Sequence, residues 1–450
     1  MIRACKGNIV RTWIGETMPT SLQEIAEKAR SDKKYRFRNL YQKLNESFLE
    51  SCWKYVRKDA ASGADRVTAK EYGRHLAENI RDLVDRLKRF SYRAKLVLRK
   101  WIPKGKDKLR PLGLPALEDK LLQIAASLIL QVIYEADFLP FSFGYRPRAG
   151  ARMAVRKLKD ELQFGRYRYI VEADIKGIFD NIDHEWMIKM LKERIDDKRF
   201  LRLIEKWLKA GILEKDGKVI HPITGTPQGG IVSPVLANVY LHYALDLWFE
   251  RVVKKYCKGA VYLCRYADDF VVLFEYHEDA ERFYRELPER LGKFKLQLSM
   301  EKTQIIRFNR FPESEGASFN FLGFEFRWGT SLKGKKIVKL RTSRKKFDQA
   351  MLNFTEWCRE NRSNPIHRLM KTLNRKLRGY YNYYGVIGNY ESLNEFFRNA
   401  LRILKKWINR RSQKHKYNWK RFRMMLEHHR IEKPRITEKL EYQLSLQYSF

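Results

Sequence analysis

The chain has 450 residues, 44% of them hydrophobic, so it can bury more than one core and we expect two or three packed units. Lysine and arginine total 92 against 53 acidic residues, a formal net charge of +39. Such an excess repels itself in a compact fold unless a polyanion compensates it. The composition therefore predicts a nucleic-acid partner, but it names no reaction.

Each cysteine stands apart from the others in the sequence: Cys5, Cys52, Cys257, Cys264 and Cys358. Their odd number and the lack of a C-x-x-C pair argue against a disulfide framework or a structural zinc site, and favour a reducing cytoplasm. The longest stretch without Asp, Glu, Lys or Arg, residues 219–245, contains Gly-Thr-Pro-Gln-Gly-Gly and cannot form a membrane helix. We therefore expect a soluble protein with no membrane contact.

The first segment, residues 1–65, is expected to be a basic extension that is helical over 20–58 and ends in the turn-rich stretch 59–65. Residues 33–41 read Lys-Lys-Tyr-Arg-Phe-Arg-Asn-Leu-Tyr, and rings beside guanidinium groups suit unpaired bases. The alternative is that the three rings pack inward while the charges are solvated. The candidate RNA contacts here are Lys33, Lys34, Arg36 and Arg38.

Residues 66–340 are expected to mix helices with strands. Helical periodicity covers 71–90, and residues 121–134 are apolar nearly all round, which predicts a buried helix. A basic hairpin tip is expected at 103–110. The expected strands cover 96–102, 169–174, 261–266 and 270–274.

The remainder of the chain is expected to be helical. Helix breakers divide it into three segments that predict a compact unit over 341–412. A short basic tail over 413–450 is expected to follow, and the alternative is that this tail is a reduced DNA-binding region. The three segments are 343–362, 365–384 and 391–411. Residues 401–425 contain ten Lys or Arg and no acid, so we favour contact with RNA or DNA, through Arg410 and Arg411 among others, over a merely solvated helix face.

Three acidic residues stand at the ends of expected strands. Asp268 and Asp269 lie between two short apolar runs, as expected for a hairpin with carboxylates at its tip, and Asp174 ends the strand 169–174. The pair alone is weak evidence, because Asp is a common turn residue. If the strand ends are neighbours, the carboxylates meet, and such a cluster suits two Mg²⁺ ions roughly 3.5–4 Å apart that promote nucleotidyl transfer.

Seven blocks follow one another in the order of reverse transcriptase motifs. They are Arg-Pro-Leu-Gly-Leu-Pro (110–115), Ser-Phe-Gly-Tyr-Arg-Pro (142–147), Asp-Ile-Lys-Gly-Ile-Phe-Asp-Asn-Ile-Asp-His (174–184), Gly-Thr-Pro-Gln-Gly-Gly-Ile-Val-Ser-Pro (225–234), Tyr-Ala-Asp-Asp (266–269), Glu-Lys-Thr (301–303) and Phe-Leu-Gly-Phe (321–324). With Gly-Tyr-Tyr-Asn-Tyr-Tyr-Gly (379–385), the chain resembles the reverse transcriptase-maturases of bacterial group II introns, densely over 55–330.

The resemblance implies an α+β fold and a location in the bacterial cytoplasm. Fingers and palm of a right-hand polymerase, with an antiparallel palm sheet, would occupy 66–340, and an all-α thumb or maturase (X) domain would follow. It also implies that the chain extends a DNA primer with dNTPs on an RNA template, that it binds intron RNA to assist splicing and retrohoming at a DNA target, and that it acts as a monomer or homodimer. The implied cofactor is a pair of Mg²⁺ ions, which Mn²⁺ can replace.

Site residues are carried over from the family's motifs position by position. The implied metal site comprises Asp174, Asp268, Asp269 and the backbone of Ile175. The implied nucleotide site comprises Lys104, Arg110, Phe179, Gln228 and Lys302, and the primer and template would meet Arg146 and Gly323. In this reading Phe179 rejects the ribose 2′-hydroxyl and Lys302 protonates pyrophosphate. The alternatives are an ordinary core Phe179, a solvated Lys302 and a plain strand-end Gly323; Gln228 could merely bind loop amides, and the charges of Lys104 and Arg110 could simply be exposed.

Three rival functions remain open at this point. They are a splicing cofactor without polymerase activity, an RNA-dependent RNA polymerase, and a reverse transcriptase domesticated for defence or repair. No Cys-rich nuclease site follows the third helical segment, so we expect any retrohoming to use a nick supplied elsewhere. The ring of Phe179 disfavours the RNA polymerase.

Overall fold

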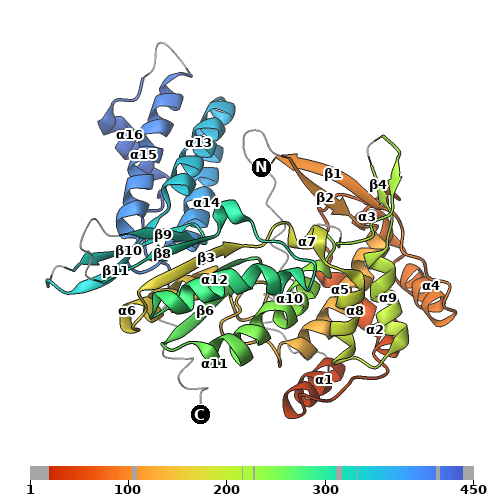
Figure 1. The fold of residues 1–450 in the computed structure, drawn as a ribbon. Helices are drawn as coiled ribbons and strands as arrows, with labels where there is room; N and C mark the ends of the chain where they lie inside the picture. Colours follow the sequence, from red (N-terminus) through yellow and green to blue (C-terminus); the bar gives the residue numbers. More distant parts are fainter. Residues whose placement is uncertain are drawn as a thin grey trace. The chain divides into compact units, whose positions relative to one another are not determined.

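The computed structural model describes residues 20–103, 109–214, 216–226, 229–310, 317–331, 333–411 and 416–438 (Figure 1). Contacts divide the chain into two compact units. The first comprises residues 1–151, 171–272 and 276–305, and the second comprises 152–170, 273–275 and 306–450. Within the described residues, no helix combines the length and the apolar character needed to cross a membrane.

Helices make up most of the first unit. Its α-helices are α1 (Thr20–Ser31), α2 (Glu46–Cys52), α3 (Ala69–Arg74), α4 (Leu76–Lys88), α5 (Leu117–Tyr134), α7 (Ile178–Asn181), α8 (His184–Lys192), α9 (Lys198–Leu208), α10 (Ser233–Leu241), α11 (Lys254–Tyr256) and α12 (His277–Gly292). The helix predicted over 71–90 is two helices, because the backbone leaves the helical region at His75. A capping box formed by Thr68 and Glu71 starts the first of them.

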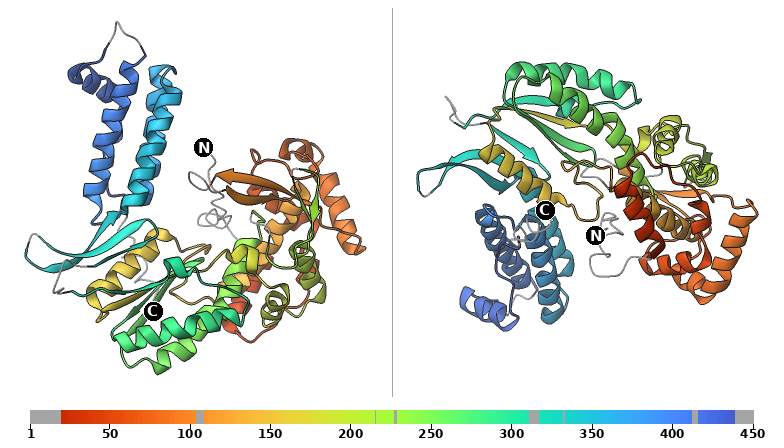
Figure 2. Two further views of the ribbon diagram at one scale, coloured as in Figure 1. Left: turned by 45° about the horizontal axis from the view of Figure 1, so that its top comes forward. Right: turned by 90° about the horizontal axis from the view of Figure 1, so that it is seen from below.

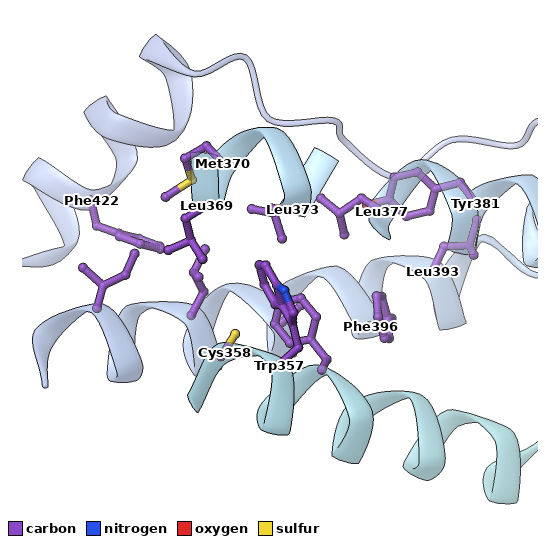
Figure 3. Packing of buried hydrophobic residues seen from close by; sticks show 14 of the residues in the cluster. Trp357, Cys358, Leu369, Met370, Leu373, Leu377, Tyr381, Leu393, Phe396 and Phe422 are labelled. Atoms are coloured by element: carbon purple, nitrogen blue, oxygen red, sulfur yellow. The ribbon is translucent and has the colours of Figure 1, made fainter. Parts of the chain in front are cut away.

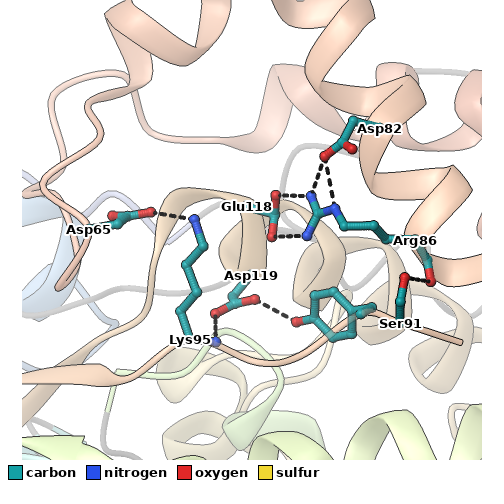
Figure 4. Close-up of polar contacts among 8 residues, drawn as sticks. Asp65, Asp82, Arg86, Ser91, Lys95, Glu118 and Asp119 are labelled. Carbon is teal, nitrogen blue, oxygen red and sulfur yellow. Dashed lines mark hydrogen bonds and ion pairs between the residues drawn. The ribbon is translucent and has the colours of Figure 1, made fainter.

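Helix α5 is buried on nearly every side, as its sequence predicts, and its first turn carries two buried carboxylates (Figure 4). Arg86 of α4 donates to both oxygens of Glu118, at 3.0 and 2.5 Å. The hydroxyl of Tyr92 and the backbone N–H of Lys95 donate to Asp119, at 2.5 and 3.0 Å. Because a buried carboxylate needs such partners, these bonds anchor the segment that leads into strand β1.

A small sheet follows this anchor, with strand order β2-β1-β4-β5. Its strands are β1 (Val97–Pro103), β2 (Leu109–Leu114), β4 (Ile212–Leu213) and β5 (Val219–Ile220). The strand predicted at 96–102 is present as β1, which pairs antiparallel with β2 from Leu98↔Leu114 to Pro103↔Leu109. Most of the hairpin tip predicted at 103–110 lies outside the described residues.

The larger sheet has the strand order β6-β7-β3-β8. Its strands are β3 (Tyr169–Asp174), β6 (Val261–Tyr266), β7 (Asp269–Phe274) and β8 (Gln304–Arg307). These bounds confirm the three strands predicted from residue pattern. Only Ala267 and Asp268 connect β6 to β7, and a connection this short joins antiparallel neighbours.

The second unit combines helix α6 (Ala151–Phe164) with the antiparallel sheet β11-β10-β9 and a helical bundle (Figure 2). The strands are β9 (Ser318–Phe321), β10 (Phe324–Thr330) and β11 (Lys336–Thr342). The bundle helices are α13 (Arg344–Asn361), α14 (Ile366–Tyr384) and α15 (Tyr390–Asn409), which confirms the three predicted segments to within two residues. Apolar residues of all three form one core (Figure 3).

The region after residue 412 differs from the predicted short tail. It contains a fourth helix, α16 (Trp419–His428), whose Phe422 is fully buried in the same core. Residues 431–438 then run along α14. The guanidinium of Arg378 donates to the carboxylate of Glu432 at 2.7 Å, and the N–H of Thr437 donates to the carbonyl of Gly385. The helical unit therefore extends beyond the boundary predicted at 412, because apolar side chains spaced among the basic ones supply a packed face.

Candidate active site

The structure brings together the three acidic residues singled out from the sequence. Asp268 and Asp269 lie at the β6–β7 turn, and Asp174 ends β3, which neighbours β7 in the sheet. The backbone N–H of Ile175 approaches the carbonyl of Asp268 at 3.5 Å, so the two strand ends adjoin. Strand order, which no single motif contains, decides this convergence.

The carboxyl groups are close enough to perturb one another. Asp269 is exposed as a residue, but surrounding atoms bury most of its carboxyl group. This burial raises the pKa of Asp269 to about 7, and the negative charges of Asp268 and Asp174 are the next largest causes. A side-chain hydrogen bond with Asp174 contributes in the same direction. The ammonium of Lys302 donates a hydrogen bond to Asp174 Oδ2, and this bond raises the pKa of Lys302.

The backbone at Ile175 also turns toward the acidic turn. Ser299 N–H donates to the Asp174 carbonyl and Lys176 N–H donates to the Gln297 carbonyl, each at 2.8 Å, so these two groups face the segment before β8. Peptide groups alternate direction along an extended chain. The carbonyl of Ile175 therefore faces the opposite side, the side of Asp268, as a backbone metal ligand requires.

The donor set suits a hard divalent cation. Crowded carboxylates gain from a cation that relieves their repulsion, which raises the pKa of Asp269, and oxygen ligands are those that Mg²⁺ prefers. No set of three His, Cys, Asp or Glu side chains in the described residues is arranged to hold an ion alone. Backbone, substrate phosphate and water would have to complete the coordination, as is usual for Mg²⁺.

A buried ion pair between Arg265 and Asp246 supports the acidic turn. This pair was not predicted from the sequence. Ala267 has a positive φ of 58°, an uncommon conformation for a residue with a side chain. Its carbonyl accepts a bond from Arg265, whose guanidinium also binds Asp246 at 2.6 and 2.7 Å, Asn238 and Ser142. The signal available in the sequence was an arginine inside an otherwise apolar strand.

The segment 141–145 lies against the same turn. The N–H of Phe143 donates to the carbonyl of Arg265, the N–H of Arg265 donates to that of Phe141, and Asn238 donates to the carbonyl of Gly144 at 2.6 Å. A Cβ on Gly144 would lie 2.3 Å from the backbone nitrogen of Ala267. Glycine is required here because two backbones touch.

Helix α7 carries Phe179 beside the acidic cluster. Phe179 is buried, and its ring meets the edge of Tyr145 at a centroid distance of 6.3 Å. Asp268 is the strongest charged neighbour of Tyr145, whose pKa rises to about 12 through burial first and that charge second. The side chain of Tyr145 therefore contacts the Phe179 ring and interacts with the Asp268 carboxylate.

The loop 224–226 packs closely on α7. The N–H of Thr226 donates to the carbonyl of Phe179 at 2.6 Å, and a Cβ on Gly225, whose φ is +88°, would lie 2.7 Å from the carbonyl oxygen of Asp180. His184 Nε2 bonds the Gly225 carbonyl at 2.7 Å, which helps to hold this loop on α7. The first part of the Gly-Thr-Pro-Gln-Gly-Gly block thus braces the Phe179 helix.

Arg110 of β2 is close enough to Tyr145 for its positive charge to oppose the rise in the pKa of that residue. Gly229 approaches the carbonyl of Gly113 in β2 so closely that a Cβ there would lie 2.3 Å away. The other two residues expected at the nucleotide site, Lys104 and Gln228, lie outside the described residues.

Comparisons with known proteins agree with this geometry. The model of the reverse transcriptase (RNA-dependent DNA polymerase) family matches residues 102–326, half of the chain, and that of the group II intron maturase-specific domain matches 346–425. Protein YkfC of Escherichia coli K12 is 34% identical over 55% of this chain and 72% of its own length. The chain belongs to the group II intron reverse transcriptase-maturase family.

Other relatives of this family are similar over different shares of their length. The group II intron-encoded protein LtrA of Lactococcus lactis is 32% identical over 71% of this chain, which spans 65% of the length of that relative. The putative COX1/OXI3 intron 1 protein of Saccharomyces cerevisiae is 35% identical over 36% of this chain and 19% of its own length.

Two other site residues expected from the family resemblance, Arg146 and Gly323, have the following surroundings. Arg146 forms an ion pair with Glu135 and donates to the carbonyls of Leu139 and Ser142. Gly323 lies in the second unit, at the β9–β10 turn.

The basic residues proposed to bind RNA in this family member are mostly exposed. Lys33 and Lys34 are exposed, whereas Arg36 and Arg38 also bind Asp196. The aromatic residues between them divide: Phe37 is buried and Tyr35 is exposed. In the helical unit, Arg410 lies over the ring of Trp407, and Arg411 donates to the carbonyl of Asn364.

Proposed function

We propose that the chain is an RNA-directed DNA polymerase that extends a primer with dNTPs on an RNA template. The convergence of Asp174, Asp268 and Asp269 carries the proposal, because nucleotidyl transfer needs clustered carboxylates at a primer end. The sheet β6-β7-β3-β8 would serve as palm, the sheet β2-β1-β4-β5 with its helices as fingers, and α13 to α15 as thumb. Membership of the family supports this assignment.

Two Mg²⁺ ions, or Mn²⁺ in their place, would supply charge stabilisation at the attacking and leaving oxygens. Asp174, Asp268 and the Ile175 carbonyl would hold them, and Asp269 would add charge beside the primer terminus. Arg265 keeps the turn in place through the Ala267 carbonyl.

We infer that Lys302 combines two tasks. Its ammonium neutralises Asp174 in the chain without substrate, and the same group can give a proton to departing pyrophosphate. The bond to Asp174 raises the pKa of Lys302, so the group is an ammonium near neutral pH. Arg110, from β2, would bind the triphosphate, because a guanidinium matches phosphate oxygens in pairs.

Phe179 would select deoxyribonucleotides. Its buried ring lies beside Tyr145 near Asp268, where a filled volume excludes a 2′-hydroxyl. A Phe179→Val variant should incorporate ribonucleotides more readily by about tenfold or more, with dNTP incorporation reduced far less. A Phe37→Val variant, which alters a buried ring outside the site, is the control.

The experiment that tests the proposal is extension of a DNA primer annealed to an RNA template. The wild-type chain should make cDNA with Mg²⁺ and dNTPs, and Asp268→Asn should lose that activity while retaining its fold and primer-template affinity. Asp59→Asn, which alters a carboxylate that is 78% exposed, should behave as wild type. A folded wild-type chain that is inert, or an active Asp268→Asn chain, contradicts the proposal.

We also propose a maturase function, supported by the match of residues 346–425 to the maturase-specific domain and by the exposed basic residues of α15 and α16. Intron RNA would then be the second partner. Because the two functions use different residues, Asp268→Asn should leave intron splicing nearly intact. Splicing that falls in parallel with cDNA synthesis would show that the functions are not separable.

A further inference from the structure

The turn between β9 and β10 is built on an unfavourable residue. Phe321 pairs with Phe324, so the tip consists of Leu322 and Gly323 alone. Both have positive φ, 51° and 82°, which is the signature of a type I′ turn. Asn or Gly normally occupies the first position, and a leucine there is strained. Strain of this kind persists only where surrounding contacts enforce it.

Two hydrogen bonds from the helical unit enforce the turn. The hydroxyl of Tyr383 in α14 donates to the carbonyl of Leu322 at 2.9 Å, and the N–H of Ser343, which precedes α13, donates to the carbonyl of Gly323 at 2.9 Å. The ring of Tyr383 stacks on Phe324 with 6.0 Å between centroids, which holds the hydroxyl in place. Both tip carbonyls are therefore directed toward the helices.

The direction of these carbonyls determines what the tip presents elsewhere. In a trans peptide the carbonyl and the N–H point in opposite directions. Since Tyr383 binds the Leu322 carbonyl, the N–H of Gly323 points away from α14. A Cβ at position 323 would lie 3.1 Å from the Tyr384 hydroxyl, so glycine also keeps this peptide free of a side chain. Backbone N–H groups of this kind are common ligands of nucleic-acid phosphates.

We infer that Tyr383 is a positioning residue for polymerisation: its hydroxyl orients the 322–323 peptide so that the Gly323 N–H donates to a phosphate of the primer strand. The inference rests on the proposed polymerase function. It assigns a residue within the maturase-specific match, residues 346–425, to the handling of the primer.

The test compares Tyr383→Phe with Tyr381→Phe. The control removes a hydroxyl from the same helix, one that donates to the Glu432 carbonyl at 3.3 Å instead of to the turn. Tyr383→Phe should raise the KM for primer-template about three- to tenfold, the equivalent of one hydrogen bond, with the KM for dNTP unchanged. Tyr381→Phe should leave both constants unchanged. Equal effects in the two variants, or no effect in either, would overturn the inference.

A second substitution tests the role of strain. Asn-Gly forms a type I′ turn without help, so in a Leu322→Asn background the loss caused by Tyr383→Phe should shrink to less than about twofold. An undiminished loss in that background would show that the hydroxyl acts otherwise than by holding the turn.

A measurement without catalysis separates this inference from the proposed function. Hydrogen exchange of peptides covering 317–331 should be faster in Tyr383→Phe than in wild type and unchanged in Tyr381→Phe. Unchanged exchange in Tyr383→Phe refutes the inference even in an active enzyme. A wild-type chain that is inert on every primer-template refutes the polymerase proposal instead, while the exchange data still report whether Tyr383 holds the turn.

Discussion

Replacement of Gly144 by alanine tests whether the position of the acidic turn controls catalysis. The added Cβ would lie 2.3 Å from the backbone nitrogen of Ala267 and 3.0 Å from its Cα, whereas ordinary contacts begin near 3.4 Å. One of the two backbones must therefore move by about 1 Å. Neither can move easily, because Asn238 binds the Gly144 carbonyl and Phe143 binds that of Arg265.

The expected effect on rate is large and the expected effect on stability is moderate. A displacement of about 1 Å in a catalytic group costs about 100-fold in rate, and overpacking of this kind costs about 1–3 kcal/mol of folding free energy. Gly144→Ala should therefore lower kcat for primer extension about 100-fold, with a small change in primer-template affinity.

Steady-state extension of a DNA primer on a homopolymer RNA, together with thermal unfolding, measures both quantities. Gly292→Ala is the control, since Gly292 ends α12 and has no atom within 4 Å of an added Cβ. If Gly144→Ala is folded and its kcat stays within about threefold of wild type, the contact between Gly144 and the turn does not govern the site.

Three further changes have defined outcomes. The pKa of Asp269 is about 7 in the folded chain and near 3.8 in the unfolded chain, so between these values the native state binds more protons. In EDTA the free energy of unfolding should therefore fall as the pH rises from 5 to 7. Asp269→Asn should flatten this dependence in denaturant titrations, and an identical slope in the variant would contradict the assignment. Lys302→Ala should lower kcat about 100-fold with the dNTP KM little changed, and full activity in Lys302→Arg would show that charge suffices without proton transfer. Phe422→Ala should destabilise the helical unit by about 3–5 kcal/mol, against less than about 0.5 for the 60% exposed Met424→Ala, as judged by thermal unfolding; equal losses would exclude α16 from the core.

Much of the local structure follows from residue pattern. The strand at 169–174, the hairpin around the acidic pair and the three helices after 341 were predicted at nearly their observed bounds, because period-2 and period-3.6 patterns depend only on neighbouring residues. The motif order likewise identified the acidic residues. Helix α16 was missed because its basic composition masked the apolar positions of Phe422 and its neighbours.

The arrangement of those parts depends on contacts that no motif contains. Asp174 meets Asp269 because β3 lies beside β7, and the turn keeps its strained shape because Arg265 reaches Asp246 and the Ala267 carbonyl in the core. Sequence by itself determined the family, the chemistry-bearing residues and most elements, since these are local properties of the chain. Only the tertiary structure decided which strands are neighbours and which side chains hold the turns, because these contacts join residues far apart in the chain and form only when it has folded.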